Sequence, residues 1–470
     1  MAILWTMMLG TSFAGPAAPY RAVGVRPQKI EAVDERREDV LVLKLIEGTT
    51  IRFNEDGKLE TAQFPELSAL LYDAKPWINR TVQELRDARK RVNPSETLGD
   101  LSLYLQIRGP DAIRRGNALL KSPWIETAYL APKPPPPPID IDPITPDFSG
   151  EQHYIAPGPA GFGFDVTHRW PGASGTHTTI ADIEYGYDPT HEDLGERAFM
   201  ELGYPMNWYP FHGNGVLGIL GAVDNGYGIT GLVPDAALIV VSPFVDNEEY
   251  NVAESIVLAT EHLDAGDVLL IEQQGWVDSI FLPVEIDPAV FDAITLAVAK
   301  GIVVIEPAGN GASNLDPPAW SGWFDQDVRD SGAIIVGGGA SPLSEYTPRS
   351  WYPMGSCYGE RLDVQGWFDA VVTTTAADGH PEFTDLFFPD GDGRQAYTAS
   401  FGGTSGAAPI VAAMAAVMNS VGWELHGEPW DPVDLREAMI STGHPQPSEE
   451  ERMIGAQPDL RRMLQTWGIR

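Results

Sequence analysis

The chain has 470 residues, and 31 Lys and Arg against 66 Asp and Glu give it a formal net charge of −35 at pH 7. Its hydrophobic (43%) and charged (21%) fractions are those of a globular protein and exclude a wholly disordered chain, a collagen and a coiled coil. At roughly 150 residues per domain, the length predicts about three domains, or one large domain with an appendage. A chain this acidic repels phosphate groups, so we expect no nucleic-acid partner. No apolar run reaches the ~18–20 residues of a membrane-spanning helix, so we expect no membrane partner.

The first 18 residues resemble a secretory signal peptide, which predicts a secreted or periplasmic protein. Residues 3–14 are mostly apolar, and small residues follow as far as Ala18, the order of an apolar segment and a cleavage site. The basic start of a signal peptide is missing, because the first basic residue is Arg21. The alternatives are a mis-called start and a buried N-terminal segment. The single cysteine, Cys357, excludes an intramolecular disulfide, and we interpret it as a packing residue.

Residues 39–130 predict a small α+β domain. The run DVLVLKLIEGTTIRF from Asp39 alternates apolar and polar residues in places, as strands do, and turn residues follow at 54–57. Helix-like patterns cover 65–92 and 100–120. Residues 131–150 form a proline-rich linker, since five consecutive prolines at 134–138 favour a stiff, extended spacer.

Residues 151–470 predict an α/β domain whose parallel sheet is covered by helices on both faces. Short, wholly apolar runs alternate with helix-like stretches, the pattern of parallel strands buried on both sides. In such sheets the ligand site lies beyond the carboxyl ends of the strands. The expected strands are His177–Glu184, Ala236–Ser242, Gly266–Ile271, Gly301–Glu306 and Gly332–Gly337, and the expected helices are Gly213–Val223, Asn251–Asp264, Pro288–Lys300, Thr404–Ser420 and Pro432–Ile440.

Four features of this domain carry chemistry that could work together. Glu184 ends an apolar strand, and His212 stands between glycines where a helix of small residues begins. Asn310 follows another apolar strand, where its amide could donate to a developing oxyanion. Ser405 lies in a glycine-rich turn that opens an apolar helix, and the free N–H groups of a helix N-terminus suit a nucleophile. Each feature alone has an ordinary structural explanation.

Taken in the order acid, His, Asn, Ser, these features resemble the subtilisin-like serine peptidases, the subtilase family, over roughly residues 165–440. The resemblance implies a subtilisin-like fold and a protein or peptide substrate. The segments that carry it are IEYGYDPTHEDL around Glu184, HGNGVLG from His212, PAGN ending at Asn310, GTSGAAP around Ser405, and NGYGITGLVPDAAL at 225–238.

The resemblance also implies a role for each residue. Ser405 would attack the scissile carbonyl, and His212 would take the serine proton and return it to the leaving amine. Glu184 would hold the imidazole, while Asn310 and the Ser405 N–H would form the oxyanion hole. Leu269–Trp276 would lie beside the substrate backbone. No cofactor is required, and the 39–130 domain would be a propeptide acting as an intramolecular inhibitor, or else a permanent accessory domain.

The carboxylates depart from the family pattern. Glu184 stands where Asp is usual, and Asp182, two residues earlier on the same face of the strand, is the alternative acid. Glu272 and Glu306 follow other strands at positions where small or neutral residues are more usual. Clustered acids raise one another's pKa, so we hypothesise that some are protonated and share hydrogen bonds near the site; alternatively, they only pair with backbone donors.

The sequence leaves other mechanisms and functions open. Sedolisin-type peptidases share the fold and use Ser with Glu and Asp, but His212 and Asn310 favour the subtilisin-type mechanism. A catalytically inactive subtilase fold used for binding, and acyl transfer to an amine, are the functional alternatives. The remaining histidines lack the spacing of a metal site, whereas the acidic loop Phe388–Arg394 suits a structural calcium ion.

Overall fold

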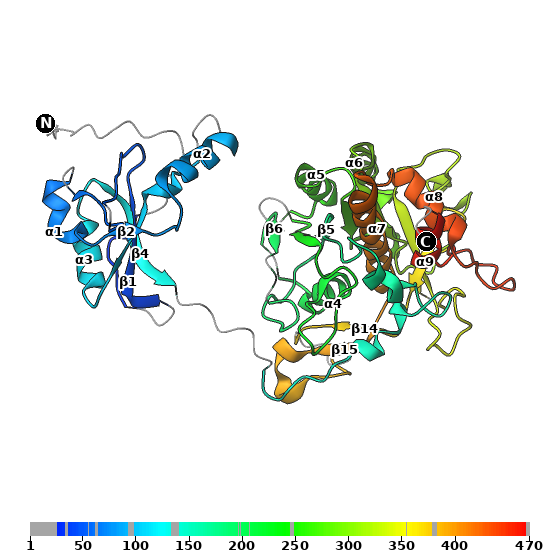
Figure 1. The fold of residues 1–470 in the computed structure, drawn as a ribbon. Helices are drawn as coiled ribbons and strands as arrows, with labels where there is room; N and C mark the ends of the chain where they lie inside the picture. Colours follow the sequence, from blue (N-terminus) through cyan, green and yellow to red (C-terminus); the bar gives the residue numbers. More distant parts are fainter. Residues whose placement is uncertain are drawn as a thin grey trace, which may run out of the picture. The chain divides into compact units, whose positions relative to one another are not determined.

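The chain divides into two compact units, residues 1–137 and 138–470, and each is described by itself (Figure 1). The computed structural model describes residues 26–32, 36–54, 56–61, 64–92, 98–132, 141–195, 197, 199–205, 207–244, 249–353, 355–377 and 383–466. The expected signal peptide, the five consecutive prolines and His380 lie outside these residues.

The N-terminal unit is a four-stranded antiparallel sheet with helices, as the α+β prediction requires. The strand order is β2-β3-β1-β4, and on the central strand β1 Leu41, Leu43 and Leu45 are fully buried. The elements are β1 (Arg36–Leu45), α1 (Ser68–Leu71), β2 (Lys75–Pro76), α2 (Val82–Val92), β3 (Tyr104–Arg108), α3 (Ala112–Leu119) and β4 (Ile125–Pro132).

The helical predictions for this unit were partly wrong. Tyr104–Arg108 is a strand that pairs with β1, because Leu105 and Ile107 alternate with partly exposed or exposed neighbours and bury one face only. Such a period of two fits a sheet and not a helix. Within 65–92 only α1 and α2 are α-helical, and Lys75–Pro76 adds an edge strand.

The second unit is built on a seven-stranded parallel sheet, so the α/β prediction is confirmed. All five expected strands are present, and two short strands that were not expected, β6 and β13, complete its edges. The order is β13-β12-β11-β8-β5-β7-β6. The strands are β5 (Thr179–Ile183), β6 (Met200–Leu202), β7 (Ala237–Val241), β8 (Val268–Ile271), β11 (Val303–Pro307), β12 (Ile334–Gly339) and β13 (Val364–Trp367).

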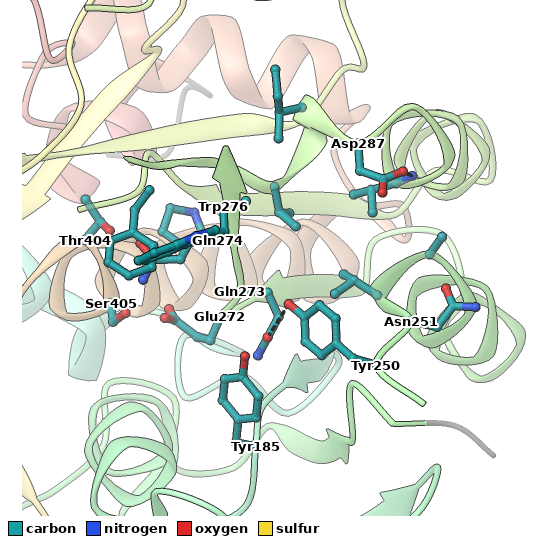
Figure 2. A pocket seen from close by; sticks show the side chains of 18 of the residues that line it. Tyr185, Tyr250, Asn251, Glu272, Gln273, Gln274, Trp276, Asp287, Thr404 and Ser405 are labelled. Atoms are coloured by element: carbon teal, nitrogen blue, oxygen red, sulfur yellow. Dashed lines mark hydrogen bonds between the residues drawn. The ribbon is translucent and has the colours of Figure 1, made fainter. Parts of the chain in front are cut away.

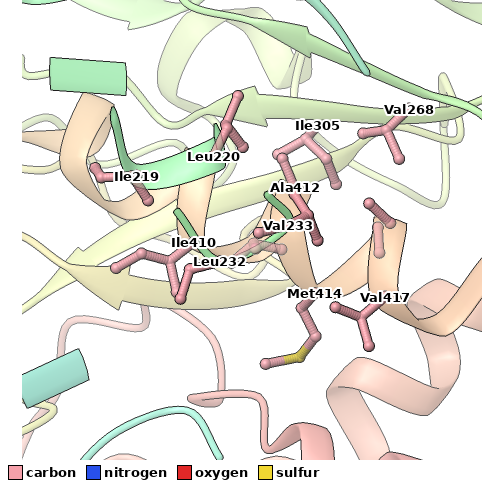
Figure 3. Close-up of a cluster of buried hydrophobic side chains, with 14 of the residues drawn as sticks. Ile219, Leu220, Leu232, Val233, Val268, Ile305, Ile410, Ala412, Met414 and Val417 are labelled. Carbon is pink, nitrogen blue, oxygen red and sulfur yellow. The ribbon is translucent and has the colours of Figure 1, made fainter. Parts of the chain in front are cut away.

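Helices cover both faces of this sheet, and alternate strand residues face each side. Val268 and Leu270 belong to the core that α4 and α7 cover (Figure 3), whereas Leu269 and Ile271 belong to the core of α5 and α6. The five expected helices are present as α4 (Pro210–Gly221), α5 (Val252–His262), α6 (Pro288–Ala299), α7 (Thr404–His426) and α8 (Pro432–Thr442), and α9 (Leu460–Thr466) follows.

In the described part of this unit, two antiparallel strand pairs form separate two-stranded sheets. One, β9 (Gln274–Val277) with β10 (Ile280–Pro283), follows β8 after two residues, and the other is β14 (Val371–Thr374) with β15 (Tyr397–Phe401), directly before α7. Helix α7 is long and apolar enough to cross a membrane by composition, but 94% of its apolar window is buried inside this unit. It is the central core helix of the unit.

Candidate active site

Glu184 and His212 meet where the carboxyl end of β5 approaches the start of α4. His212 Nδ1 and Glu184 Oε2 are 2.6 Å apart, and the other carboxylate oxygen, Oε1, accepts the Tyr185 N–H at 2.7 Å. The Glu184 side chain is fully buried, whereas 25% of the His212 side chain is exposed. The imidazole is therefore bound by a buried carboxylate and remains accessible to solvent. Such a contact fixes the proton on Nδ1 and leaves Nε2 to act as a base.

The close approach of α4 depends on small residues. Pro210 opens the helix, where its missing N–H costs nothing. A Cβ on Gly213 would lie 2.1 Å from the Gly186 carbonyl oxygen, so only glycine lets the helix lie this close to the acid loop. The buried Asn214 side chain accepts the Asp188 N–H at 2.8 Å and thereby ties α4 to the same loop.

Asp182, the alternative acid, does not reach the imidazole. It is buried on the same face as Glu184, but neither of its carboxyl oxygens has a hydrogen-bond partner among the residues that the structure describes. Burial, together with the charges of Glu184 and Glu272, raises its pKa well above the ordinary value, which favours the neutral acid. For His212, burial would lower the pKa, but the charge and hydrogen bond of Glu184, with a smaller effect of Asp182, outweigh it and leave the pKa raised.

Ser405 is the second residue of α7. The residue before the helix, Gly403, has φ +75° and ψ −176°, a conformation that favours glycine, and Gly403 has no side chain with which to cap the helix. In the described part of the chain the Ser405 N–H has no hydrogen-bond acceptor, and Ser405 makes no hydrogen bond to His212. The helix start therefore presents a free donor and a partly exposed hydroxyl to the same space.

Asn310 lies beside this helix start with a fixed amide. Its Oδ1 accepts the Thr404 N–H at 2.9 Å and the Thr404 hydroxyl at 3.1 Å, and its own N–H donates to Gln274 Oε1 at 3.0 Å. Because Oδ1 faces Thr404, the orientation of the amide is set and its Nδ2 remains as a donor. Gln274 and Thr404 were not expected as positioning residues from the sequence.

His212 and Ser405 line one cavity of about 1020 Å³. Its walls come from the end of β8, the β9–β10 hairpin, the start of α6 and aromatic residues near α4. Figure 2 shows Glu272 beside Ser405 and the Tyr250 hydroxyl bonded to Gln273. The described lining contains no Lys or Arg, and its aromatic members are Tyr185, Trp208, Tyr209, Phe211, Phe244, Tyr250, Trp276 and Phe281.

The two further glutamates have different surroundings. Glu272 joins Asp182 and Glu184 near the site, and their charges act on one another. The expected shared hydrogen bonds are not seen among the described residues, since the carboxyl oxygens of Asp182 and Glu272 have no partner there. Glu306 does not, because its neighbours Val304 and Ile305 show that even-numbered residues of β11 face the α6 side. Its Oε1 accepts the Glu285 N–H at 2.9 Å, so for Glu306 the backbone-pairing alternative holds.

In the described chain no group of three or more His, Cys, Asp or Glu is placed to hold a metal ion. In the acidic loop, Asp392 is paired with Arg394, and the calcium site there stays a prediction. His191 is fully buried, and burial lowers its pKa to about 4, so it stays neutral. Cys357 is buried and contacts the Phe281 carbonyl, in keeping with a packing role.

The sequence profile of the Subtilase family matches residues 174–456, more than half of the chain, and the chain belongs to this family. The matched range includes Glu184, His212, Asn310 and Ser405 and the strands and helices that position them. Among curated relatives, fervidolysin of Fervidobacterium pennivorans is 28% identical over 201 residues, or 38% of this chain and 27% of that protein. The minor extracellular protease Epr of Bacillus subtilis is 28% identical over 151 residues, or 31% of this chain and 22% of that protein.

The chain thus spans about a quarter of the length of these two relatives. Among solved structures, that of fervidolysin, titled a keratinolytic enzyme related to subtilisin, aligns with 94% of this chain and 64% of its own. The TM-score is 0.49 and the sequence identity 18%.

Proposed function

We propose that the chain is a secreted serine endopeptidase whose triad is Ser405, His212 and Glu184. The observation that carries the proposal is the 2.6 Å contact between Glu184 and His212 at the cavity that also exposes the start of α7. Ser405 Oγ attacks the substrate carbonyl as its proton passes to His212 Nε2, and the imidazolium is stabilised by Glu184. The proton then passes to the leaving amine, and water releases the acyl group from Ser405.

The oxyanion would be held by two donors that nothing else in the described chain occupies, the Ser405 N–H and Asn310 Nδ2. Preorganised donors of this kind supply a large share of the rate enhancement in acyl transfer. The contact between Ser405 and His212 would form when substrate arrives, because catalytic hydrogen bonds are often long without substrate.

The substrate would be an extended, unfolded peptide with aromatic or aliphatic side chains near the scissile bond. Aromatic walls dominate the described cavity and bury such side chains well. Acidic peptides would be repelled, because the second unit holds 49 Asp and Glu against 12 Lys and Arg.

The N-terminal unit would serve as an intramolecular inhibitor. It holds 19 Lys and Arg against 17 Asp and Glu, so it lacks the acidity of the second unit and is not repelled by it. Secretion is supported by the apolar N-terminus and by the family's extracellular relative.

The test is hydrolysis of unfolded casein and of quenched fluorescent peptides by the full chain, with Ser405→Ala as the matched control. We expect hydrolysis, and cleavage of the chain between the two units, in the parent protein alone. A folded parent protein that hydrolyses nothing, both before and after proteolytic removal of the N-terminal unit, would instead support the inactive binding fold. Product formed only with an added amine would support acyl transfer. A chain that stays whole while hydrolysing casein would make the N-terminal unit an accessory domain.

A further inference from the structure

Glu272 is a buried acid that the proposed triad does not use. It follows β8 directly and continues the even-numbered face of that strand, which is the face covered by α7. Only 4% of the residue is exposed, and within the described chain neither carboxyl oxygen has a partner at normal hydrogen-bond length. In Figure 2 the carboxyl group points toward Ser405.

The groups that face Glu272 would not stabilise its anion well. Asp182 and Glu184 lie at the end of β5, His212 on α4 and Ser405 on α7, and the described lining of the cavity supplies no Lys or Arg. A buried carboxylate without donors is costly, so the neutral acid is favoured. Burial first, and the charge of Glu184 second, raise the pKa of Glu272 well above the ordinary value, and the Ser405 hydroxyl offsets only part of this.

The remaining polar side chains of this wall are occupied or neutral. The Tyr250 hydroxyl donates to Gln273 Oε1 at 3.0 Å, and Gln274 accepts the Asn310 N–H. Burial raises the pKa of Tyr185, so its hydroxyl stays neutral through the pH range in which a carboxyl titrates. Ser405 is therefore the hydroxyl toward which a protonated Glu272 can donate.

We propose that Glu272, in its protonated form, donates a hydrogen bond to Ser405 Oγ and so positions the nucleophile, and that loss of this proton switches the site off. The inference rests on the proposed function. With the proton in place, Ser405 Oγ accepts from Glu272 and keeps its own O–H for His212 Nε2. Without it, the Glu272 carboxylate accepts the Ser405 O–H, which is then turned away from His212. The negative charge also opposes the charge that develops on the substrate oxygen. Only a proton exchanged with solvent is involved.

Two groups then set the pH dependence of kcat/KM. The rising limb follows loss of the His212 proton, and the falling limb follows loss of the Glu272 proton. A site with an ordinary small residue in place of Glu272 would show the rising limb alone until the protein unfolds.

The experiment measures kcat/KM on a quenched peptide between pH 4 and 10 for the full chain, Glu272→Gln and Glu272→Ser. Glu272→Gln cannot ionise but keeps an N–H donor, so we expect its falling limb to vanish while the optimum rate stays within about tenfold of the parent. Glu272→Ser should also lose the falling limb, with a rate about tenfold lower than Glu272→Gln for the lost hydrogen bond. Thermal unfolding at each pH confirms that the variants are folded.

The matched control is Glu306→Gln, since Glu306 is equally buried on the neighbouring strand β11 but faces the other side of the sheet. We expect both limbs to persist in this variant. A falling limb that is unchanged in Glu272→Gln and Glu272→Ser, or a parent profile with no falling limb, overturns the role of Glu272. A folded parent protein that is inactive at every pH, both before and after proteolytic removal of the N-terminal unit, overturns the proposed function instead.

Discussion

The proposed triad depends most directly on the length of the Glu184 side chain, which sets the distance between its carboxylate and His212. Replacing Glu184 by Asp withdraws the carboxylate by one C–C bond, about 1.5 Å. The 2.6 Å contact to His212 then opens to about 4 Å, which is too long for a hydrogen bond. Because the negative charge remains nearby, we expect Glu184→Asp to lower kcat/KM by about 10- to 100-fold.

Glu184→Gln keeps the length but removes the charge and disturbs the tautomer of His212. A triad acid made neutral costs about 10⁴-fold in rate, and we expect a loss of that order here. Since the Glu184 charge also raises the pKa of His212 against the effect of burial, its removal should move the rising limb of the pH profile to lower pH. The assay is kcat/KM on a quenched peptide from pH 4 to 10, with thermal unfolding as the check on folding.

Asp182→Asn is the matched control, because Asp182 is equally buried but makes no hydrogen bond to the imidazole. We expect it to change kcat/KM by less than about tenfold, since a neutral acid is replaced by a neutral amide. Glu184 is not the triad acid if Asp182→Asn costs as much activity as Glu184→Gln, or if Glu184→Gln keeps nearly full activity.

Three further predictions concern Asn310, Glu306 and Gly213. Asn310→Asp keeps the acceptor for the Thr404 N–H but replaces the donor by a negative oxygen, so kcat should fall by about 10²–10³-fold while KM and the melting temperature change little; an unchanged kcat would remove Asn310 from the oxyanion hole. Burial raises the pKa of Glu306 in the folded protein above 4.5, so the stability it contributes is complete below that pH and is lost as the pH rises through the folded pKa. Urea unfolding at pH 5 and pH 8 should therefore show a smaller loss of stability for Glu306→Gln than for the parent, and equal losses would contradict this. Gly213→Ala drives a Cβ into the Gly186 carbonyl oxygen, so we expect a loss of about 1–3 kcal/mol of stability by calorimetry, together with reduced kcat; an unaltered melting temperature would show that α4 can move aside freely.

Most of the second unit could be predicted from the sequence because its strands are buried on both faces. Runs such as Val268–Ile271 are apolar at every position and end at Gly or polar residues, which makes them recognisable without their partners. Parallel strands end at one edge, so residues that follow them, such as Glu184, were expected to lie near a common site.

The edges and the supporting contacts could not be predicted in the same way. The edge strand β6 has three residues, none fully buried, and it is defined by its pairing to β7 and not by its own pattern. The support of Asn310 by Gln274 and Thr404 joins segments up to 94 residues apart, which sequence spacing does not reveal.

The position of Glu306 stayed open at the level of sequence for a related reason. Glu272 and Glu306 both stand at the ends of buried strands, and the sequence does not say which face each occupies. A shift of one residue between neighbouring strands exchanges the two faces. The structure shows such a shift between β8 and β11. Even-numbered Leu270 of β8 and odd-numbered Ile305 of β11 lie in the same core, so even-numbered residues of the two strands face opposite sides of the sheet.

The most direct test of the account is to label the purified full chain with a fluorophosphonate probe, which reacts only with an activated serine, beside Ser405→Ala, His212→Ala, Glu184→Ala and Asp182→Ala. We predict that the parent protein labels, that Ser405→Ala and His212→Ala do not, and that Glu184→Ala labels far more slowly than Asp182→Ala. Absence of labelling across pH 4–9 in a folded parent protein, both before and after proteolytic removal of the N-terminal unit, would contradict the central claim that this site is a working serine peptidase centre.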